Sequence, residues 1–120
     1  MVLAAAASLW HWTQRADCTP KNLSIGHWQL SRVYALAGQG ANAKRHALRS
    51  LEFAKDESPF YIGYGHEAAA RAACLQSDAP AFQDHWGKAT ATLASIDDES
   101  ERSALQQDLD SLVPPSPPQG

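Results

Sequence analysis

The chain has 120 residues, of which 44% are hydrophobic, and its formal net charge is −3. This length suits one domain with a modest core, and the hydrophobic fraction excludes disorder as the default state. A slightly acidic chain also lacks the clustered basic surface that binding to nucleic acid requires.

The first predicted element is a helix over residues 3–17, which ends at Thr19-Pro20. This segment lacks the basic residues that open a signal peptide, and polar side chains follow it too soon for a membrane span. We therefore expect a cytoplasmic protein that does not contact a membrane. The two cysteines, Cys18 and Cys74, stand in no metal-type spacing, so we expect free thiols in a reducing interior.

Proline and glycine separate five further predicted helices. Their apolar residues recur at steps of three and four, which is the periodicity of a helix and not of a strand. Thr19-Pro20 or Asn22, and later Ser58, are candidate N-caps, while Gly38 is a typical helix stop. The expected ranges are 22–37, 41–55 and 58–76, a fifth helix that opens at 77–80, and a sixth that opens at 97–98 and ends near 112.

The sequence predicts one all-α domain over residues 1–112, followed by a Pro-rich tail over residues 113–120. The many alanines predict closely packed helices, with the tryptophans filling the gaps that small side chains leave. Gly63 and Gly65 lie at the start of the fourth helix. They mark either a tight helix crossing or an irregular first turn.

An internal repeat connects residues 31–39 with residues 70–78 at an offset of 39, as expected for helical hairpins. In the first copy, Leu30-Ser31, Tyr34, Gly38, Ala43 and Ser50-Leu51 match the small, aromatic and turn positions of the tetratricopeptide repeat (TPR) family. The chain therefore resembles that family, and residues 27–55 are similar to uncharacterised bacterial TPR-like proteins. The resemblance implies antiparallel hairpins in a right-handed superhelix of about six helices. The second copy departs from the motif at Ser77 and Phe82.

The same resemblance implies that the first helix of each pair lines a concave groove. The groove residues that it implies are Trp28, Arg32, Tyr64, Glu67 and Arg71, with Trp12 as a further recognition anchor. Aromatic and arginine side chains dominate binding hot spots, and the planar arginine fork suits carboxylates of a bound peptide. Alternatively, Glu67 forms a supporting ion pair with Arg71, one helical turn away, or with Arg32.

The leading hypothesis is a non-enzymatic interaction or scaffold module that binds a peptide or partner helix and needs no cofactor. One alternative is a metal-dependent or other enzyme site formed by His27, His46, His66, Glu67 and His85. No two histidines stand three or four residues apart, so such a site would have to be assembled from separate helices. The other alternative is a structural protein that completes its core as a homodimer.

Overall fold

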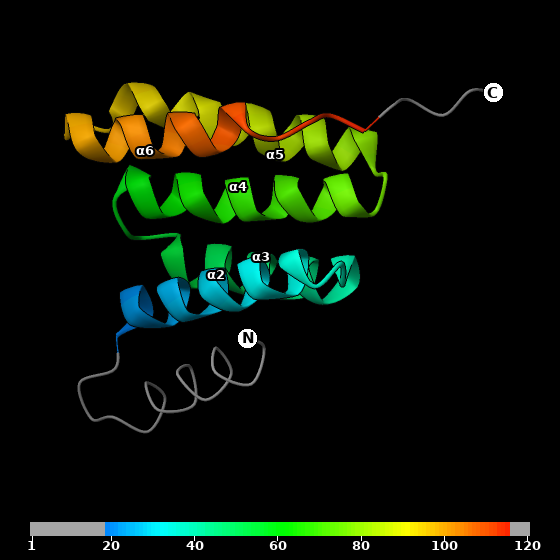
Figure 1. The fold of residues 1–120 in the computed structure, drawn as a ribbon. Coiled ribbons are helices and arrows are strands. Elements are labelled where there is room, and N and C mark those ends of the chain that lie inside the picture. The colour runs from blue at the N-terminus through cyan, green and yellow to red at the C-terminus, as the bar shows by residue number, and fades with distance from the viewer. Residues whose placement is uncertain (1–18, 116–120) are drawn as a thin grey trace.

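A computed structural model describes residues 19–115 of the chain (Figure 1). This part contains five α-helices, one turn of 3₁₀ helix and no strand, so the all-α prediction is confirmed. The predicted helix over residues 3–17, Trp12, Cys18 and residues 116–120 lie outside the described residues. No helix within residues 19–115 is long and apolar enough to cross a membrane. The elements are α2 (Pro20–Leu36), α3 (Gly40–Ala54), α4 (Pro59–Leu75), α5 (Ala79–Thr92), η1 (Leu93–Ser95) and α6 (Glu99–Asp110).

The predicted starts of these helices lie close to the observed ones, and side-chain caps set those of α2, α5 and α6. Thr19 caps α2, since its hydroxyl oxygen accepts a hydrogen bond from the backbone N–H of Asn22 at 3.2 Å. Asp98 caps α6 in the same way through the N–H of Glu101, at 2.9 Å. Ser58 occupies the predicted N-cap of α4, but its side chain makes no capping hydrogen bond there. Pro59, at the first position of α4, fixes the helical φ instead.

The 39-residue offset seen in the sequence describes two hairpins of matching geometry. The first pairs α2 with α3 and the second pairs α4 with α5, and each helix of the second hairpin begins 39 residues after its counterpart. The turn between the helices matches as well: Gly38 has a φ of 75°, and Ser77 at the corresponding position has a φ of 54°. A serine thus adopts the left-handed conformation that the first hairpin assigns to glycine.

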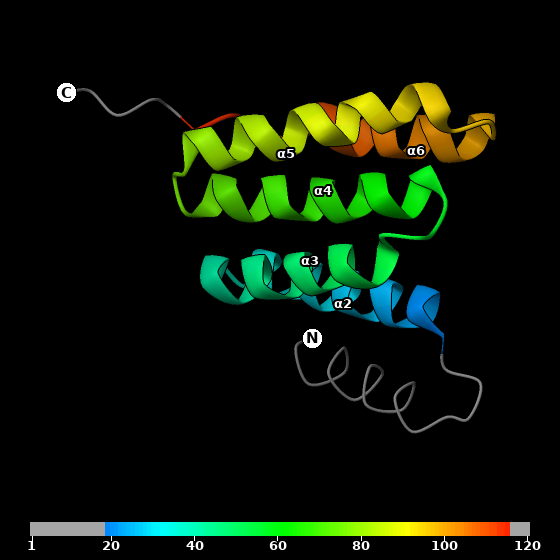
Figure 2. The same ribbon diagram turned by 180° about the vertical axis from the view of Figure 1, so that it is seen from behind.

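Small side chains allow the helices to lie close together, as the composition predicted. Ala43, Ala47 and Ala54 of α3 are fully buried. A Cβ at Gly63 would lie 2.6 Å from Leu105 Cδ2, and one at Gly65 would lie 2.6 Å from Leu51 Cδ2. The two glycines therefore mark a tight crossing of α4 with its neighbours on both sides. Figure 2 shows the result, with α3 and α5 on one face, α2 and α6 on the other, and α4 between them.

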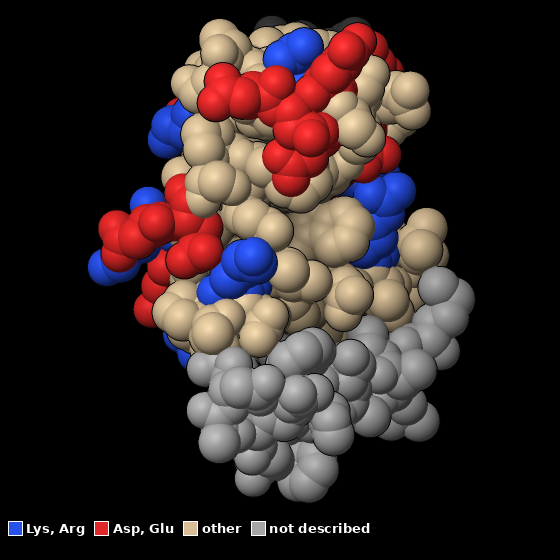
Figure 3. Space-filling view, turned by 90° about the vertical axis from the view of Figure 1, so that its left-hand side faces the viewer, with Lys and Arg blue, Asp and Glu red and all other residues tan. Residues whose placement is uncertain are grey.

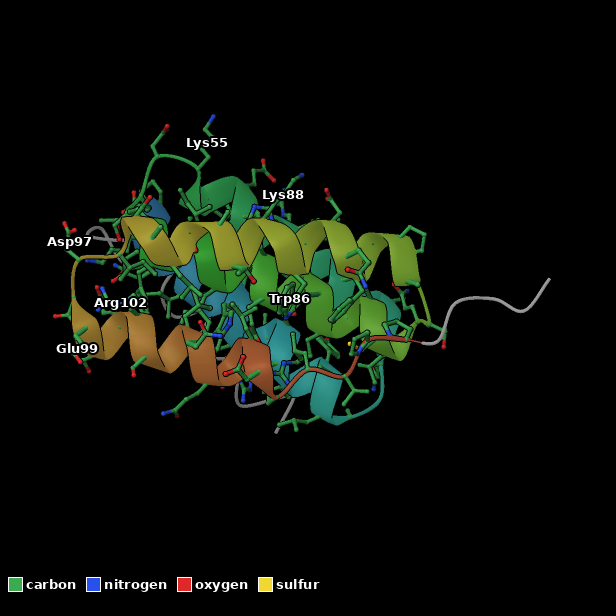
Figure 4. The ribbon with its side chains drawn as sticks, turned by 90° about the horizontal axis from the view of Figure 1, so that it is seen from above. Lys55, Trp86, Lys88, Asp97, Glu99 and Arg102 are labelled. Carbon is green, nitrogen blue, oxygen red and sulfur yellow. The ribbon has the colours of Figure 1, made fainter. Side chains whose placement is uncertain are left out.

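Helix α6 closes the end of the molecule formed by the second hairpin. Leu105 and Leu109 of α6 are fully buried against Ala89 and Ile96, and Trp86 of α5 packs beside them. Figure 4 shows Trp86 between α5 and α6, where its indole N–H donates to the carbonyl oxygen of Leu109 at 3.3 Å. The outer end of α6 is polar, and Figure 3 shows acidic side chains gathered there.

Candidate functional site

The structure brings five of the six predicted groove residues together on two neighbouring helices. Trp28 and Arg32 project from α2, and Tyr64, Glu67 and Arg71 project from α4. The sixth predicted residue, Trp12, lies outside the described residues. Trp28 and Glu67 occupy equivalent positions of the first and second hairpins, 39 residues apart, and the two side chains meet across the α2–α4 contact.

Glu67 is a fully buried carboxylate held by two neighbours. Its Oε1 accepts hydrogen bonds from Arg71 Nη2 at 2.6 Å and from Arg71 Nε at 3.0 Å. Its Oε2 faces the indole N–H of Trp28 at 3.5 Å. The alternative prediction of an ion pair between Glu67 and Arg71 is therefore confirmed. Because this pair uses two donors of the Arg71 fork, Arg71 fixes Glu67 and, through it, the ring of Trp28.

A second polar contact joins α2 and α4 to α6. The hydroxyl group of Tyr64 donates to Asp108 Oδ2 at 2.7 Å, and Arg32 Nη1 lies 3.8 Å from the same oxygen. Burial, followed by this hydrogen bond, raises the pKa of Tyr64. Asp108 was not among the predicted site residues, because its role depends on where α6 lies and no counterpart in the hairpins points to it.

An apolar pocket opens beside these residues. It has a volume of about 350 Å³, and four of its seven described lining residues are aromatic. Figure 3 looks onto the end of the molecule where α2 and α4 begin, and uncharged surface spreads there below the acidic end of α6. The described lining residues are Ser24, Ile25, Trp28, Ser50, Phe60, Tyr61 and Tyr64. The prediction included only Trp28 and Tyr64; the aromatic run at residues 60–64 was the available signal for Phe60 and Tyr61.

A second, smaller hollow of about 230 Å³ lies on the same two helices, toward their C-terminal ends. Arg32 and Arg71 line it together with exposed apolar side chains, of which Leu36 is 69% and Leu75 is 44% exposed. Cys74 also lines it, as a half-buried free thiol that donates to the carbonyl oxygen of Val113 at 3.2 Å. The hollow thus combines cationic and apolar groups at one end of the α2–α4 face.

The histidines form two separate pairs. His27 of α2 and His46 of α3 have their Nδ1 atoms 3.0 Å apart, and His66 and His85 repeat this contact in the second hairpin at the same distance. The ring centres of each pair are 5.2 Å and 5.3 Å apart. This separation is close to the nitrogen–nitrogen distance plus the distance of each nitrogen from its own ring centre. The rings therefore meet edge to edge, with the two nitrogens pointing at one another.

This edge-to-edge geometry fits an N–H···N hydrogen bond better than metal chelation, because lone pairs aimed at one another do not converge on a third point. Within residues 19–115, no group of three or more His, Cys, Asp or Glu side chains is placed to hold a metal ion. The five residues of the metal alternative are accordingly divided between two histidine pairs and the Glu67–Arg71 ion pair.

The chain was also compared with known proteins. No protein-family model, curated protein or solved structure matches it.

Proposed function

We propose that this protein is a non-catalytic, TPR-like interaction module that holds a short peptide or a partner helix along the α2–α4 face. In this proposal the two described hairpins are part of a right-handed superhelix of about six helices, and the α2–α4 face is its inner groove. The repeated hairpin geometry and the small residues at the helix crossings support this assignment. A module of this kind needs no cofactor.

Two pockets that follow one another along the α2–α4 face give this proposal its main support. The aromatic pocket of about 350 Å³ occupies the N-terminal part of the face, and the hollow of about 230 Å³ occupies its C-terminal part. Arg32 connects the two, because it lines the second hollow while its guanidinium lies 5.6 Å from the centre of the Trp28 ring. A peptide along α2 and α4 would place an apolar side chain in the pocket and a polar or acidic group near Arg32.

The groove residues would have distinct roles in such a complex. Trp28 and Tyr64 offer apolar contact area, and Arg32 offers a charged donor at the edge, with its side chain 35% exposed. Glu67 and Arg71 are positioning residues, since their charges are already paired with one another. Trp12 remains a further candidate anchor.

Peptide selection from a phage-displayed library would test this proposal. We expect selected peptides to bind the wild-type protein and to lose at least about tenfold in affinity for Ile25→Glu, which puts a charge into the apolar pocket. Leu48→Glu is the matched control, because Leu48 is a partly exposed aliphatic residue of α3 outside both hollows. Fluorescence anisotropy with labelled peptides gives the affinities. Equal loss in the two variants, or none in either, would contradict groove binding.

A homodimer is the second candidate, and it has an observation of its own. Leu36, Leu75 and Val113 all line the second hollow, and Val113 is 76% exposed. Contiguous exposed apolar side chains are typical of interaction sites. If the chain self-associates through this end, Leu36→Ser together with Leu75→Ser should make it monomeric in light scattering at several concentrations. A wild-type protein that stays monomeric throughout rules this candidate out.

We further propose a cytoplasmic location. A free, half-buried thiol such as that of Cys74 is typical of proteins in a reducing compartment. The slightly acidic composition offers no charge-driven attraction to acidic membranes or nucleic acid. Fractionation of native cells, with antibody detection of the protein, measures this directly.

A further inference from the structure

The aromatic pocket, here called the aromatic box, is lined by four rings that meet at steep angles. Trp28 and Tyr64 are inclined at 79° with their centres 5.4 Å apart. Phe60 is inclined at 81° to Tyr64 and at 75° to Tyr61, with centres 5.1 Å and 5.3 Å apart. At these distances the rings are in edge-to-face contact with one another. The pocket of about 350 Å³ opens beside this chain of four rings, and all four line it.

The polar hydrogens of two of these rings are bonded to carboxylates that are not part of the pocket lining. The indole N–H of Trp28 faces Glu67, and the hydroxyl of Tyr64 donates to Asp108. These contacts fix both ring orientations and leave the rings to form the pocket wall. They also polarise the rings, since a hydrogen bond to an anion pushes electron density into the donor. The negative potential of an aromatic face is what attracts cations.

Cations of the chain itself already lie over two of these rings. Lys21 Nζ is 5.5 Å from the centre of the Tyr61 ring, and Arg32 Cζ is 5.6 Å from that of Trp28. Both distances fall within the range of cation–π attraction. The described lining itself contains no charged side chain, so it offers no partner that would offset the dehydration of a compact ammonium ion. A cation wrapped in methyl groups avoids most of that penalty.

We infer that this box binds a methylated ammonium group, supplied either by a small quaternary ammonium compound or by a methylated lysine of a bound peptide. The peptide form depends on the proposed function, whereas the small-molecule form does not. The two forms share one chemistry: a diffuse positive charge surrounded by aromatic faces.

The test compares choline with its neutral isostere, in which carbon replaces the nitrogen, using the whole chain and isothermal titration. We expect choline to bind about tenfold more tightly, because only the charge distinguishes the two probes. Tyr61→Leu should remove that preference by replacing an aromatic wall with an aliphatic one. Tyr61→Phe is the matched control and should keep it. Equal affinity for the two probes, or no choline binding, would overturn the inference.

A second variant does not disturb the pocket wall. Lys21 is exposed and lies over Tyr61, so it competes with a ligand cation for that ring and repels it. Lys21→Ala should therefore bind choline a few-fold more tightly, whereas unchanged or weaker binding contradicts a cation site. A short peptide with trimethyl-lysine identifies the source: affinity well above that of choline favours a peptide, and equal affinity favours a small molecule. If library peptides bind but choline shows no preference, this inference fails and the proposed function stands.

Discussion

His27 and His46 meet through a single hydrogen bond between Nδ1 atoms that lie 3.0 Å apart across the first hairpin. Only one proton fits between two nitrogens at that distance, so one ring must donate and the other accept. Protonating both rings would set two N–H groups and two positive charges against each other. Burial, followed by the charge of His46, lowers the pKa of His27 from 6.5 to about 4. Burial lowers the pKa of His66 to about 4 in the same way.

We expect the free energy of unfolding to decrease as the pH falls from about 6.5 to about 4. In this window the unfolded chain binds more protons than the folded chain, because the folded-state pKa values of His27 and His66 are lowered. Above that window both states are neutral and the stabilisation is fully present. The rings are partly exposed, so solvent screening reduces the effect to the order of 1 kcal/mol per pair. Urea unfolding at successive pH values measures it.

The control for this pH dependence removes one pair. The double variant His66→Asn and His85→Asn should lose about half of the histidine-dependent decrease, since the equivalent first pair remains. The difference between the two profiles isolates the contribution of the second pair. Identical pH profiles for the variant and the wild type would show that the pairs do not couple protonation to folding.

Gly65→Ala should destabilise the protein by about 1–3 kcal/mol, because the new Cβ would overpack against Leu51 at 2.6 Å and 2.9 Å. Gly87→Ala provides the contrast, since Gly87 lies in α5 with nothing within 4 Å of the added atom. That change should stabilise the chain by about 0.5–1 kcal/mol through helix propensity. Thermal and urea unfolding compare the two. A stabilising effect at both positions would mean that the α3–α4 crossing is looser than described.

Glu67→Ala should cost about 3 kcal/mol, because it leaves the Arg71 guanidinium and the Trp28 indole without their buried partner. The reference is Asp84→Ala. Asp84 and Lys88 form an ion pair with the same four-residue spacing, but both side chains are more than half exposed. Losing that exposed pair should cost less than about 1 kcal/mol. Similar losses in the two variants would argue against a buried role for Glu67.

Exchanging the residues at the two turns should have opposite effects. Ser77→Gly removes the strain of a serine at a φ of 54° and should stabilise the second hairpin by about 1 kcal/mol. Gly38→Ser introduces that strain at a φ of 75° and should destabilise the first hairpin by a similar amount. Chemical denaturation of both variants would reveal whether the turns are equivalent. Effects of the same sign would disagree with the repeat.

The helices and their caps could be predicted from the sequence because they depend on neighbouring residues. Thr19-Pro20 opens α2 and Gly38 ends it through local hydrogen bonding and backbone conformation. Gly63 and Gly65 were left open between a tight crossing and an irregular turn, and the structure supports the crossing, since added Cβ atoms would meet α3 and α6. The Glu67–Arg71 pair was also predictable, because helical spacing alone brings the two side chains together.

Contacts between helices were harder to predict. The two histidine pairs did have a signal, since His27 and His66, like His46 and His85, are separated by the 39 residues of the repeat. The repeat thus relates the histidines as well as the backbone motif. Asp108 had no such signal, because its contact with Tyr64 depends on how α6 lies across α4. Helix packing and not local spacing decides such contacts.

Within residues 19–115, α4 is the helix that connects the two ends of the molecule, since all four other helices pack against it. Helices α2 and α3 pack against α4 from one side, and α5 and α6 pack against it from the other, while neither α2 nor α3 packs against α5 or α6. A disturbance at one end therefore reaches the other through α4 or through side-chain contacts such as the Arg32–Asp108 ion pair. Hydrogen exchange should be slowest in α4 and faster toward the outer helices, because α4 is packed on both sides and they are not.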